Sequence, residues 1–363
     1  MKNRSIYRCL YPISFLYGVG VRLRNYLYNK EILKSKSYPI PIICIGNLSV
    51  GGSGKTPMVE YLIRHLGSKY RIAVVSRGYK RRSKGLVIAL PNDTASQIGD
   101  EPRQILYNFP KVMMVLDGNR RRAIEYLLSL PKEEQPEIIL LDDGFQHRRV
   151  LPSLSILLTD WNKPYIKDKL LPVGRLRESL EGALRADCII LTRCPEEIPP
   201  IEYRIMERNL SLYPHQSLLF SRTVSGDLTP LFPKEAVAAN NGNVKQRVIA
   251  IAGIAQPEYF FADLKKRFNV IKTLHYPDHH HFSERELASF STLLSDHPSS
   301  LLVLTQKDAV RIIDYKEKLP QQLKSRLYYI PIETVLSEED STKLEKIVEK
   351  TIRQVNQNSS LHL

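Results

Sequence analysis

The segment "IICIGNLSVGGSGKTPMVEYLIRHL" (residues 42–66) constrains the fold more than any other part of the chain. It joins an apolar run, a glycine-rich turn and a helical pattern, which is the order of elements around a phosphate-binding loop. Gly51, Gly52 and Gly54 let backbone N–H groups turn inward around phosphate oxygens, and the start of the following helix adds positive potential. The segment therefore predicts a nucleotide site at the end of a buried strand.

The side chains of this loop indicate how it would bind a nucleotide. Lys55 would reach the outer phosphates, and the Thr56 hydroxyl would be a ligand of Mg²⁺. Ser49 stands where the usual pattern has its first glycine, but that glycine chiefly lets the chain leave the strand, so a small serine can replace it. The residues predicted to bind the nucleotide here are Ser49, Val50, Gly51, Gly52, Ser53, Gly54, Lys55 and Thr56.

Short apolar runs rich in β-branched residues recur along the chain, with helical or loop segments between them. They include "RIAVVSRG", "KVMMVLD", "EIILLDDG", "LSILLTD" and "ADCIILTR". Such runs indicate strands covered on both faces, and their alternation with helices predicts a mostly parallel, P-loop NTPase-like sheet in an α/β domain. A second set of runs begins at "RVIAIAGIA" and predicts a smaller α/β domain.

These patterns also predict where the domains begin and end. The Gly, Pro and Asn content of "GDLTPLFPKEAVAANNGNVKQ" indicates a linker between the two domains. The predicted parts are an N-terminal amphipathic membrane-surface segment 1–36, a phosphate-loop core 37–225, a linker 226–246, a smaller C-terminal α/β domain 247–355, and a frayed tail 356–363.

Composition narrows the class of protein without choosing a function. Lys and Arg outnumber Asp and Glu by 53 to 38, and the net charge of +15 favours an acidic partner such as a nucleotide, a nucleic acid or an anionic membrane. No CxxC pair is present, so the cysteines indicate buried thiols in a reducing cytoplasm rather than zinc ligands or disulfides. The cysteines are Cys9, Cys44, Cys188 and Cys194.

The N-terminus places an uncharged stretch, Cys9 to Val21, between basic flanks. This stretch is too short to span a bilayer as a helix. A signal peptide is disfavoured because the apolar part runs into Arg22 and Arg24 without a small-residue cleavage site. Aromatic residues between arginines suit a helix lying in the headgroup region, although a helix packed on its own domain fits the pattern equally well.

The segment "EIILLDDGFQH" supplies a second half for the nucleotide site. It predicts a buried strand that ends in Asp142 and Asp143, where an aspartate can hold a metal ion or its water shell. Paired aspartates at a strand end are otherwise often loop caps. The phosphate loop elsewhere in the chain favours the interpretation as a metal site.

Several motifs, taken in order, resemble those of the tetraacyldisaccharide 4'-kinases of lipid A biosynthesis. They are "GNLSVGGSGKTP", "VVSRGYKR", "GDEP", "LDDGFQHRR", "LLPVGRLRE", "YPDHHHF" and "LTQKDAVR". The resemblance extends from about Tyr11 to about Arg311, and in that family the loop itself begins with Ser or Thr. Ser49 therefore supports the resemblance.

The resemblance implies an ATP- and Mg²⁺-dependent lipid kinase. The γ-phosphate would pass to the 4'-hydroxyl of a tetraacylated glucosamine disaccharide 1-phosphate, forming the 4'-phosphorylated lipid A precursor, lipid IVA. The implied place is the cytoplasmic face of a Gram-negative inner membrane, with a peripheral or monotopic attachment. The implied partners are the lipid substrate and an anionic membrane surface, with no nucleic acid and no obligate protein partner.

A substrate with four acyl chains leaves the bilayer only at high cost, because each buried CH₂ contributes roughly 0.8 kcal/mol. The resemblance therefore favours the membrane-surface interpretation of the N-terminal segment. It also implies that Asp100 is the catalytic base, working with a histidine of "PDHHHF". His279 is the first choice and His280 the second, whereas His281 would face solvent. On residue type alone, the histidine run fits a polar surface loop best and a zinc-type site second, because histidines adjacent in sequence seldom point to one ion.

An Asp–His pair suits this role, because the carboxylate orients the imidazole and raises its pKa while either group can take a proton near neutrality. The resemblance further implies that Arg77 and Arg177 bind the ATP phosphates or the 1-phosphate of the substrate, since a guanidinium donates in a planar fork. Arg177 is also expected to be catalytic, and Glu101 is expected to join Thr56 and the two aspartates at the metal.

Other residues near these motifs have less definite roles. Lys307 and Asp308 are candidates for closing the nucleotide pocket, and Gln306 replaces the commoner Glu of the family, which puts a charge pair there in doubt. Gln146 and His147 are expected to surround the site. The run 120–122 fits a phosphate contact or a solvated helix face.

Two functions of other classes fit part of the sequence. A basic nucleotide-driven protein that acts on nucleic acid would share the charge and the loop, but strand-tracking motifs with interleaved aromatics are not found. A non-catalytic nucleotide switch at the membrane would need neither Asp100 nor the histidine run.

Overall fold

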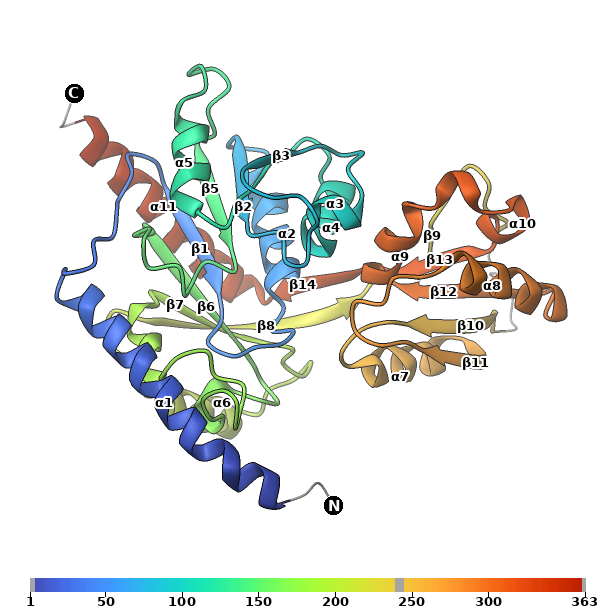
Figure 1. Ribbon diagram of the computed structural model, residues 1–363, viewed down its shortest axis with the longest axis horizontal. Helices are drawn as coiled ribbons and strands as arrows, with labels where there is room; N and C mark the ends of the chain where they lie inside the picture. The colour runs from blue at the N-terminus through green and yellow to red at the C-terminus, as the bar shows by residue number, and fades with distance from the viewer. Residues whose placement is uncertain (1–3, 239–244, 361–363) are drawn as a thin grey trace.

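Two β-sheets organise the chain, of which the computed structural model describes residues 4–238 and 245–360. In these ranges the larger sheet has nine strands in the order β14-β8-β7-β6-β1-β5-β2-β4-β3, and the smaller has five in the order β11-β10-β12-β13-β9. Figure 1 shows the two sheets side by side, with helices packed against each. The predicted α/β class, with a large, mostly parallel sheet and a smaller second unit, is confirmed.

The larger sheet is built from short apolar strands that are buried on both faces. Its inner strands pair in parallel, while β3 and β14 pair antiparallel at the two edges. Apolar side chains form a cluster on each face, as expected for strands without alternating polar residues. The strands are β1 (Ile42–Gly46), β2 (Ile72–Ser76), β3 (Val87–Ala89), β4 (Met113–Leu116), β5 (Ile138–Asp142), β6 (Leu154–Asp160), β7 (Cys188–Thr192), β8 (Ser217–Ser225) and β14 (Ile332–Leu336).

Helices cover both faces of the larger sheet. The first of them after the phosphate loop, α2, buries one apolar side that includes Met58 and Leu62. The helices of this part are α1 (Arg4–Asn29), α2 (Lys55–Leu66), α3 (Ala95–Ile98), α4 (Asp100–Asn108), α5 (Arg120–Leu128), α6 (Pro200–Leu210) and α11 (Glu338–Ser360), with 3₁₀ turns η1 (Tyr165–Lys167) and η2 (Leu180–Arg185).

The smaller sheet forms a second core of its own. Its strands are parallel except for β9, which pairs antiparallel with β13. The strands are β9 (Thr229–Pro230), β10 (Arg247–Ala252), β11 (Asn269–His275), β12 (Ser300–Thr305) and β13 (Leu327–Ile330). The helices are α7 (Pro257–Arg267), α8 (Glu284–Asp296), α9 (Gln306–Ile313) and α10 (Gln321–Lys324), with the 3₁₀ turn η3 (Lys316–Lys318).

The structure departs from the predicted domain boundaries at both ends of the smaller unit. The predicted linker 226–246 contributes β9 and the buried Leu231 and Phe232 to the second core. After β13 the chain returns to the larger sheet, where β14 pairs with β8 and α11 packs on the first core. The predicted range 247–355 missed this return because a strand's pairing partner is not encoded locally. Helix α11 also continues to Ser360, inside the predicted tail, and residues 361–363 lie outside the described residues.

The two predicted halves of the nucleotide site emerge from neighbouring strands. β1 pairs in parallel with β5, and the register places Ile45 opposite Asp142. The phosphate loop follows β1 and the two aspartates end β5, so both leave the same edge of the sheet. Ligands of open α/β sheets bind at this carboxyl edge.

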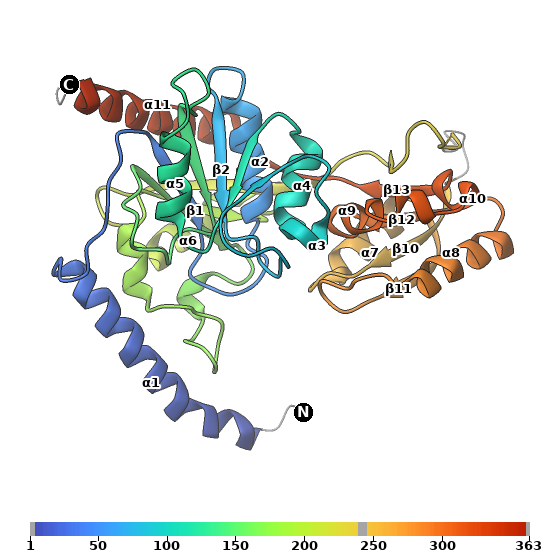
Figure 2. The ribbon, with the colours of Figure 1, turned by 45° about the horizontal axis from the view of Figure 1, so that its top comes forward.

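Helix α1 lies along the outside of the larger domain (Figure 2). Its exposed side chains include Phe15, which is 64% exposed, and Leu16, which is 69% exposed. Among the described residues, no helix is both long and apolar enough to cross a bilayer. Its other side contacts the segment around Leu170, where Ser14 Oγ donates to Leu170 O at 3.0 Å, so the helix is packed on its own domain, and the membrane-surface interpretation stays a prediction.

Three of the four cysteines are buried free thiols, as their apolar surroundings predict. They are Cys44, Cys188 and Cys194. The side chain of Cys9 lies outside the described residues.

Candidate functional site

The phosphate loop has a backbone that its glycines make possible. Gly51 has a φ of +116° and Gly54 a φ of +82°, both in the region that favours glycine. Gly54 is the N-cap of α2, and its carbonyl accepts the first helical hydrogen bond from Met58 at 3.1 Å. The chain therefore turns from β1 into α2 with the positive end of the helix at the loop.

Lys55 lies between polar groups of the loop and of β5. Its Nζ donates to Asn47 Oδ1 at 3.3 Å and lies 3.5 Å from Asp143 Oδ1. Asn47 in turn donates to Ser53 Oγ at 2.8 Å, and this hydrogen bond links the beginning of the loop to its end. Thr56 is buried beside Lys55 at the start of α2. The lysine is thus held at the loop by contacts that a phosphate could replace.

Ser49 fills its position without a side-chain partner. Its Oγ is buried and makes no hydrogen bond within the described residues, while its backbone bridges to Leu176. The adjacent Val50 N–H donates to Arg175 O at 2.7 Å, and Arg177 N–H donates to Leu48 O at 2.7 Å. The loop therefore runs beside the segment that carries Arg177, which brings two distant motifs together.

The two aspartates at the end of β5 have opposite environments. Asp142 is buried and accepts a hydrogen bond from Ser76 Oγ at 3.0 Å. Burial and the neighbouring Asp143 raise the pKa of Asp142 to about 6. Burial alone would also raise the pKa of Asp143, but Lys55 and Arg177 hold it below its ordinary value. Arg177 Nη1 lies 2.9 Å from Asp143 Oδ2, so a lysine and an arginine share this carboxylate.

This donor set fits Mg²⁺ with a nucleotide. Thr56, Asp142 and Asp143 offer only oxygen ligands, which Mg²⁺ prefers, and a divalent cation would relieve the repulsion between the buried Asp142 and the adjacent, partly exposed Asp143. No group of three or more His, Cys, Asp or Glu side chains in the described ranges could hold a metal by itself. Such a sparse protein set is usual for Mg²⁺, which keeps waters and phosphate oxygens as its other ligands.

A second polar group joins the two domains around Asp100, the first residue of α4. His279 Nδ1 lies 2.6 Å from Asp100 Oδ2, and Arg311 Nη2 donates to the same oxygen at 2.7 Å. Asp100 is 6% exposed. Burial alone would raise its pKa, but the hydrogen bonds from His279 and Arg311 hold the pKa of Asp100 well below its ordinary value. The carboxylate is therefore ionised and shared by two side chains of the smaller domain.

The structure separates the three adjacent histidines. His279 contacts Asp100, whereas His280 Nε2 lies 2.9 Å from Glu286 Oε1 and His281 is exposed. The two paired histidines therefore point to different carboxylates, which is not the arrangement of a zinc site. Of the alternatives left by the sequence, His279 is the one that meets Asp100.

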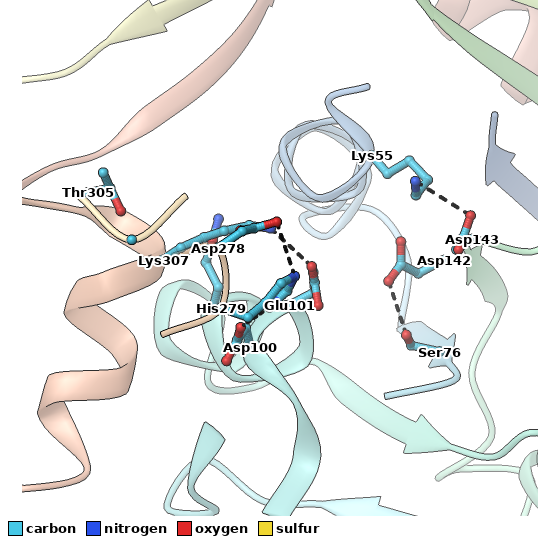
Figure 3. A network of polar contacts seen from close by, with 12 residues as sticks. Lys55, Ser76, Asp100, Glu101, Asp142, Asp143, Asp278, His279, Thr305 and Lys307 are labelled. Atoms are coloured by element: carbon cyan, nitrogen blue, oxygen red, sulfur yellow. Dashed lines mark hydrogen bonds and ion pairs between the residues drawn. The ribbon is translucent and has the colours of Figure 1, made fainter. Parts of the chain in front are cut away.

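Glu101, which is predicted to join the metal ligands, contacts a lysine of the smaller domain. It makes an ion pair with Lys307, whose Nζ lies 3.0 Å from Glu101 Oε1. Its negative charge nevertheless raises the pKa of Asp142, so the two groups lie within electrostatic reach of each other. Figure 3 shows Lys55, Asp142 and Asp143 on one side and the Asp100 group on the other, with dashed contacts inside each group. Among the residues drawn there, no hydrogen bond or ion pair joins the two sides.

Arg311 was missed by the sequence analysis as a functional residue. It is 2% exposed and donates to Asp308 Oδ1 at 2.7 Å as well as to Asp100. The spacing of Asp308 and Arg311 on one helix indicates an i,i+3 ion pair, which could have been predicted. Its other carboxylate partner, Asp100, comes from another domain and leaves no local signal. Asp308 lies in the first turn of α9, whose N-cap is Thr305, and its Oδ2 accepts a hydrogen bond from Gly253 N–H at 2.8 Å.

The remaining predicted residues differ in their surroundings. Arg77 is exposed after β2. Arg120 is 4% exposed and donates to Asp117 O at 3.1 Å, so of the two alternatives for residues 120–122 the solvated helix face does not describe this residue. Burial, with the charges of Arg120 and other arginines, lowers the pKa of His147 to about 4, which keeps it neutral at physiological pH. Gln146 donates to Asn47 O at 2.7 Å and thereby touches the base of the phosphate loop.

Gln306 makes only neutral contacts, in agreement with the doubt about a charge pair. It is buried, donates to Asn108 Oδ1 at 3.3 Å and accepts from Ile332 N–H at 3.2 Å. These bonds connect α4, α9 and β14 where the two domains meet.

Known proteins are similar in sequence to this chain over almost its whole length. A family model described as Tetraacyldisaccharide-1-P 4'-kinase matches residues 6–353. The Tetraacyldisaccharide 4'-kinase of Porphyromonas gingivalis is 48% identical over 341 residues, which cover 93% of this chain and 94% of the relative. That of Bacteroides thetaiotaomicron is 44% identical, covering 98% and 96%. The crystal structure of LpxK from Aquifex aeolicus in complex with ATP is 30% identical, covers 96% of this chain and 99% of that one, and has a TM-score of 0.72.

Proposed function

The chain belongs to the tetraacyldisaccharide-1-P 4'-kinase family, and from this membership we propose that it transfers the γ-phosphate of ATP to the 4'-hydroxyl of tetraacyldisaccharide 1-phosphate. The product is the 4'-phosphorylated precursor of lipid A. The structural observation that best supports the proposal is the pairing of Asp100 with His279 across the two domains, in the same region as Lys55 and Asp142 (Figure 3). A nucleotide switch would need the loop but not this pair.

The nucleotide side would work by positioning and charge neutralisation, which dominate phosphoryl transfer. The backbone of the phosphate loop would hold the phosphates, and Lys55 and Arg177 would exchange their contacts with Asp143 for contacts with phosphate oxygens. Thr56, Asp142 and Asp143 would hold Mg²⁺, which neutralises phosphate charge when bound. Arg77, at the surface after β2, would contribute a further cation.

The acceptor side would work through the Asp100–His279 pair. Asp100 stays ionised because Arg311 and His279 both donate to it. The carboxylate orients the imidazole through Nδ1, and Nε2, which lies 3.8 Å from Asp278 Oδ2, would be the ring nitrogen that meets the acceptor. The pair would then take the proton of the 4'-hydroxyl as the new O–P bond forms, while the bond from the γ-phosphorus to the bridging oxygen breaks and ADP leaves. Lys307, fixed by Glu101, would close the nucleotide pocket from the smaller domain.

Membrane attachment would follow from α1. Its exposed apolar side chains suit the boundary between headgroups and acyl chains, and the net charge of +15 favours an anionic surface. A peripheral or monotopic attachment at the cytoplasmic face of the inner membrane would bring the site to a lipid substrate that does not leave the bilayer.

The test of the proposed function is transfer of labelled γ-phosphate from ATP to purified tetraacyldisaccharide 1-phosphate in detergent. Mg²⁺-dependent label on the 4' position of the lipid is the expected result. ATP hydrolysis without label on the lipid would support the proposed nucleotide site and contradict the proposed acceptor. Hydrolysis that rises on adding single-stranded or duplex nucleic acid would instead support a protein that acts on nucleic acid.

The proposed membrane contact predicts that charged side chains on α1 release the protein from vesicles. Phe15→Asp or Leu16→Asp should each lower binding to anionic vesicles by about tenfold or more, because an apolar side chain no longer enters the bilayer and a like charge faces the lipid. Vesicle sedimentation measures the effect. Tyr259→Asp, at a 62% exposed position on α7, is the matched control and should sediment like the wild type. Equal sedimentation of all variants would contradict the proposed attachment.

A further inference from the structure

Helix α1 contacts the segment that carries Arg177 through the buried Ser14 and through Tyr17, which is 36% exposed. Ser14 Oγ donates to Leu170 O at 3.0 Å, and the Tyr17 hydroxyl donates to the carbonyl oxygen of Arg177 at 2.6 Å. The fit is close, because a Cβ at Gly18 would lie 2.8 Å from Leu170 Cδ1. A helix that served only to attach the protein to a membrane would not need contacts with a phosphate-site arginine.

A buried carboxylate makes a second connection between α1 and the site. The Glu178 side chain is fully buried, with 0% exposed. Its Oε2 accepts from Asn25 Nδ2 of α1 at 3.2 Å and from Arg185 Nη2 at 2.8 Å, and its Oε1 accepts from Gln146 Nε2 at 3.0 Å. Burial of an ionised carboxylate is tolerated only when donors surround it. Removing Asn25 therefore removes one of the bonds that fix the Glu178 side chain.

Glu178 is connected to the phosphate site through Gln146. Gln146, which donates to Glu178 and to Asn47 O, accepts a hydrogen bond from Arg177 Nη1 at 3.3 Å through its Oε1. The same Nη1 donates to both oxygens of Asp143. A continuous series of hydrogen bonds thus runs from Asn25 to the Arg177 guanidinium, while Tyr17 reaches the Arg177 backbone. Two routes from α1 converge on one arginine.

We propose that α1 forms part of the catalytic structure, with Tyr17, Asn25 and Glu178 acting as positioning residues that fix Arg177 at the transferring phosphate. The inference rests on the proposed function, since it assigns Arg177 to the reaction. Its consequence is that attachment to the lipid surface and orientation of the arginine depend on the same helix. A shift of α1 at the membrane would alter turnover through Arg177.

The experiment compares Tyr17→Phe and Asn25→Ala with matched controls, using lipid phosphorylation in detergent, where vesicle binding is not needed. Each variant loses one hydrogen bond, so kcat is expected to fall about fivefold while the KM for ATP and vesicle binding stay near wild type. Tyr61→Phe is the tyrosine control, because its hydroxyl contacts Ser341 at 2.8 Å in α11 instead. Asn29→Ala is the asparagine control, because Asn29 joins α1 to Arg148 and not to Glu178.

A double-mutant cycle with Arg177→Lys separates positioning from general weakening. If Tyr17 and Asn25 act through Arg177, then each substitution should lower kcat about fivefold in the wild type and leave it nearly unchanged in the Arg177→Lys background. The inference would be overturned if the loss caused by Tyr17→Phe or Asn25→Ala multiplied with the loss caused by Arg177→Lys, or if kcat were unchanged in the single variants. In either case, lipid phosphorylation by the wild type would still uphold the proposed function. Absence of lipid phosphorylation by the wild type would overturn both.

Discussion

Replacing Asp100 with asparagine is expected to lower the rate of lipid phosphorylation by about a thousandfold while ATP still binds. The amide keeps the shape of the side chain but not its charge, and that charge accepts hydrogen bonds from both His279 and Arg311. Without it, the imidazole loses the partner that orients Nδ1 and stabilises its protonated form. Initial rates of label transfer measure the loss, and titration with ATP shows that the nucleotide site remains.

Two comparisons make this prediction specific. His279→Gln should cause a loss of similar size, and the double variant should be no worse than either single one, because the two groups act as a unit. His281→Asn, at an exposed neighbouring position, should retain wild-type turnover. Since Asp100→Asn leaves Arg311 buried beside a neutral group, thermal unfolding must accompany the rates. Rapid phosphorylation by a folded Asp100→Asn variant would rule out this pair as the proton acceptor.

The nucleotide side of the site could be predicted from the sequence because its parts are nearly contiguous. Residues 42–66 contain a strand, a loop and a helix start, and each has a local signal in glycine placement or hydrophobic pattern. Asp142 and Asp143 follow a second apolar run, and parallel strands place their carboxyl ends at one edge. Local chemistry and a general rule of sheet geometry were sufficient here.

The residues of the acceptor side could not be predicted from local sequence patterns. Asp100 and His279 lie in different domains, so only the family resemblance brought them together before the structure was known. Arg311 completes the group from α9, and no pattern near it indicates a partner in α4. The return of β14 to the larger sheet was missed for the same reason, since strand pairing over a long stretch of chain has no local signal. Glu178 illustrates the limit most clearly, because a glutamate in a polar motif gives no sign that it will be fully buried.

The ion pairs around Asp143 suggest how the site is kept ready for a nucleotide. Lys55 and Arg177 both contact this carboxylate, which holds two cations close together that would otherwise repel each other. Phosphate oxygens can take over these contacts with little movement of either side chain. Such prior placement of charge is the main way in which a protein accelerates phosphoryl transfer.

Lys55→Ala is therefore expected to lower lipid phosphorylation by about a thousandfold, the second large effect predicted for this site. The lysine is the loop cation proposed to reach the outer phosphates, and its removal leaves Asp143 with Arg177 alone. The measurement is label transfer to the lipid, together with ATP hydrolysis in the absence of lipid. Lys69→Ala is the matched control, because Lys69 also forms an ion pair, with Glu345 at 2.8 Å, but at the surface beyond the end of α2.

The outcome also decides whether a loop that begins with serine still acts as a phosphate loop. Loss of lipid label in Lys55→Ala with retention in Lys69→Ala would assign the phosphate contact to the loop lysine, as its place at the start of α2 requires. Transfer that persists in Lys55→Ala would mean that Arg177 and the backbone of the loop suffice. Since Arg177 is connected to α1 through Glu178, Asn25→Ala should then cause a larger loss in the Lys55→Ala background than in the wild type, which the same assay measures.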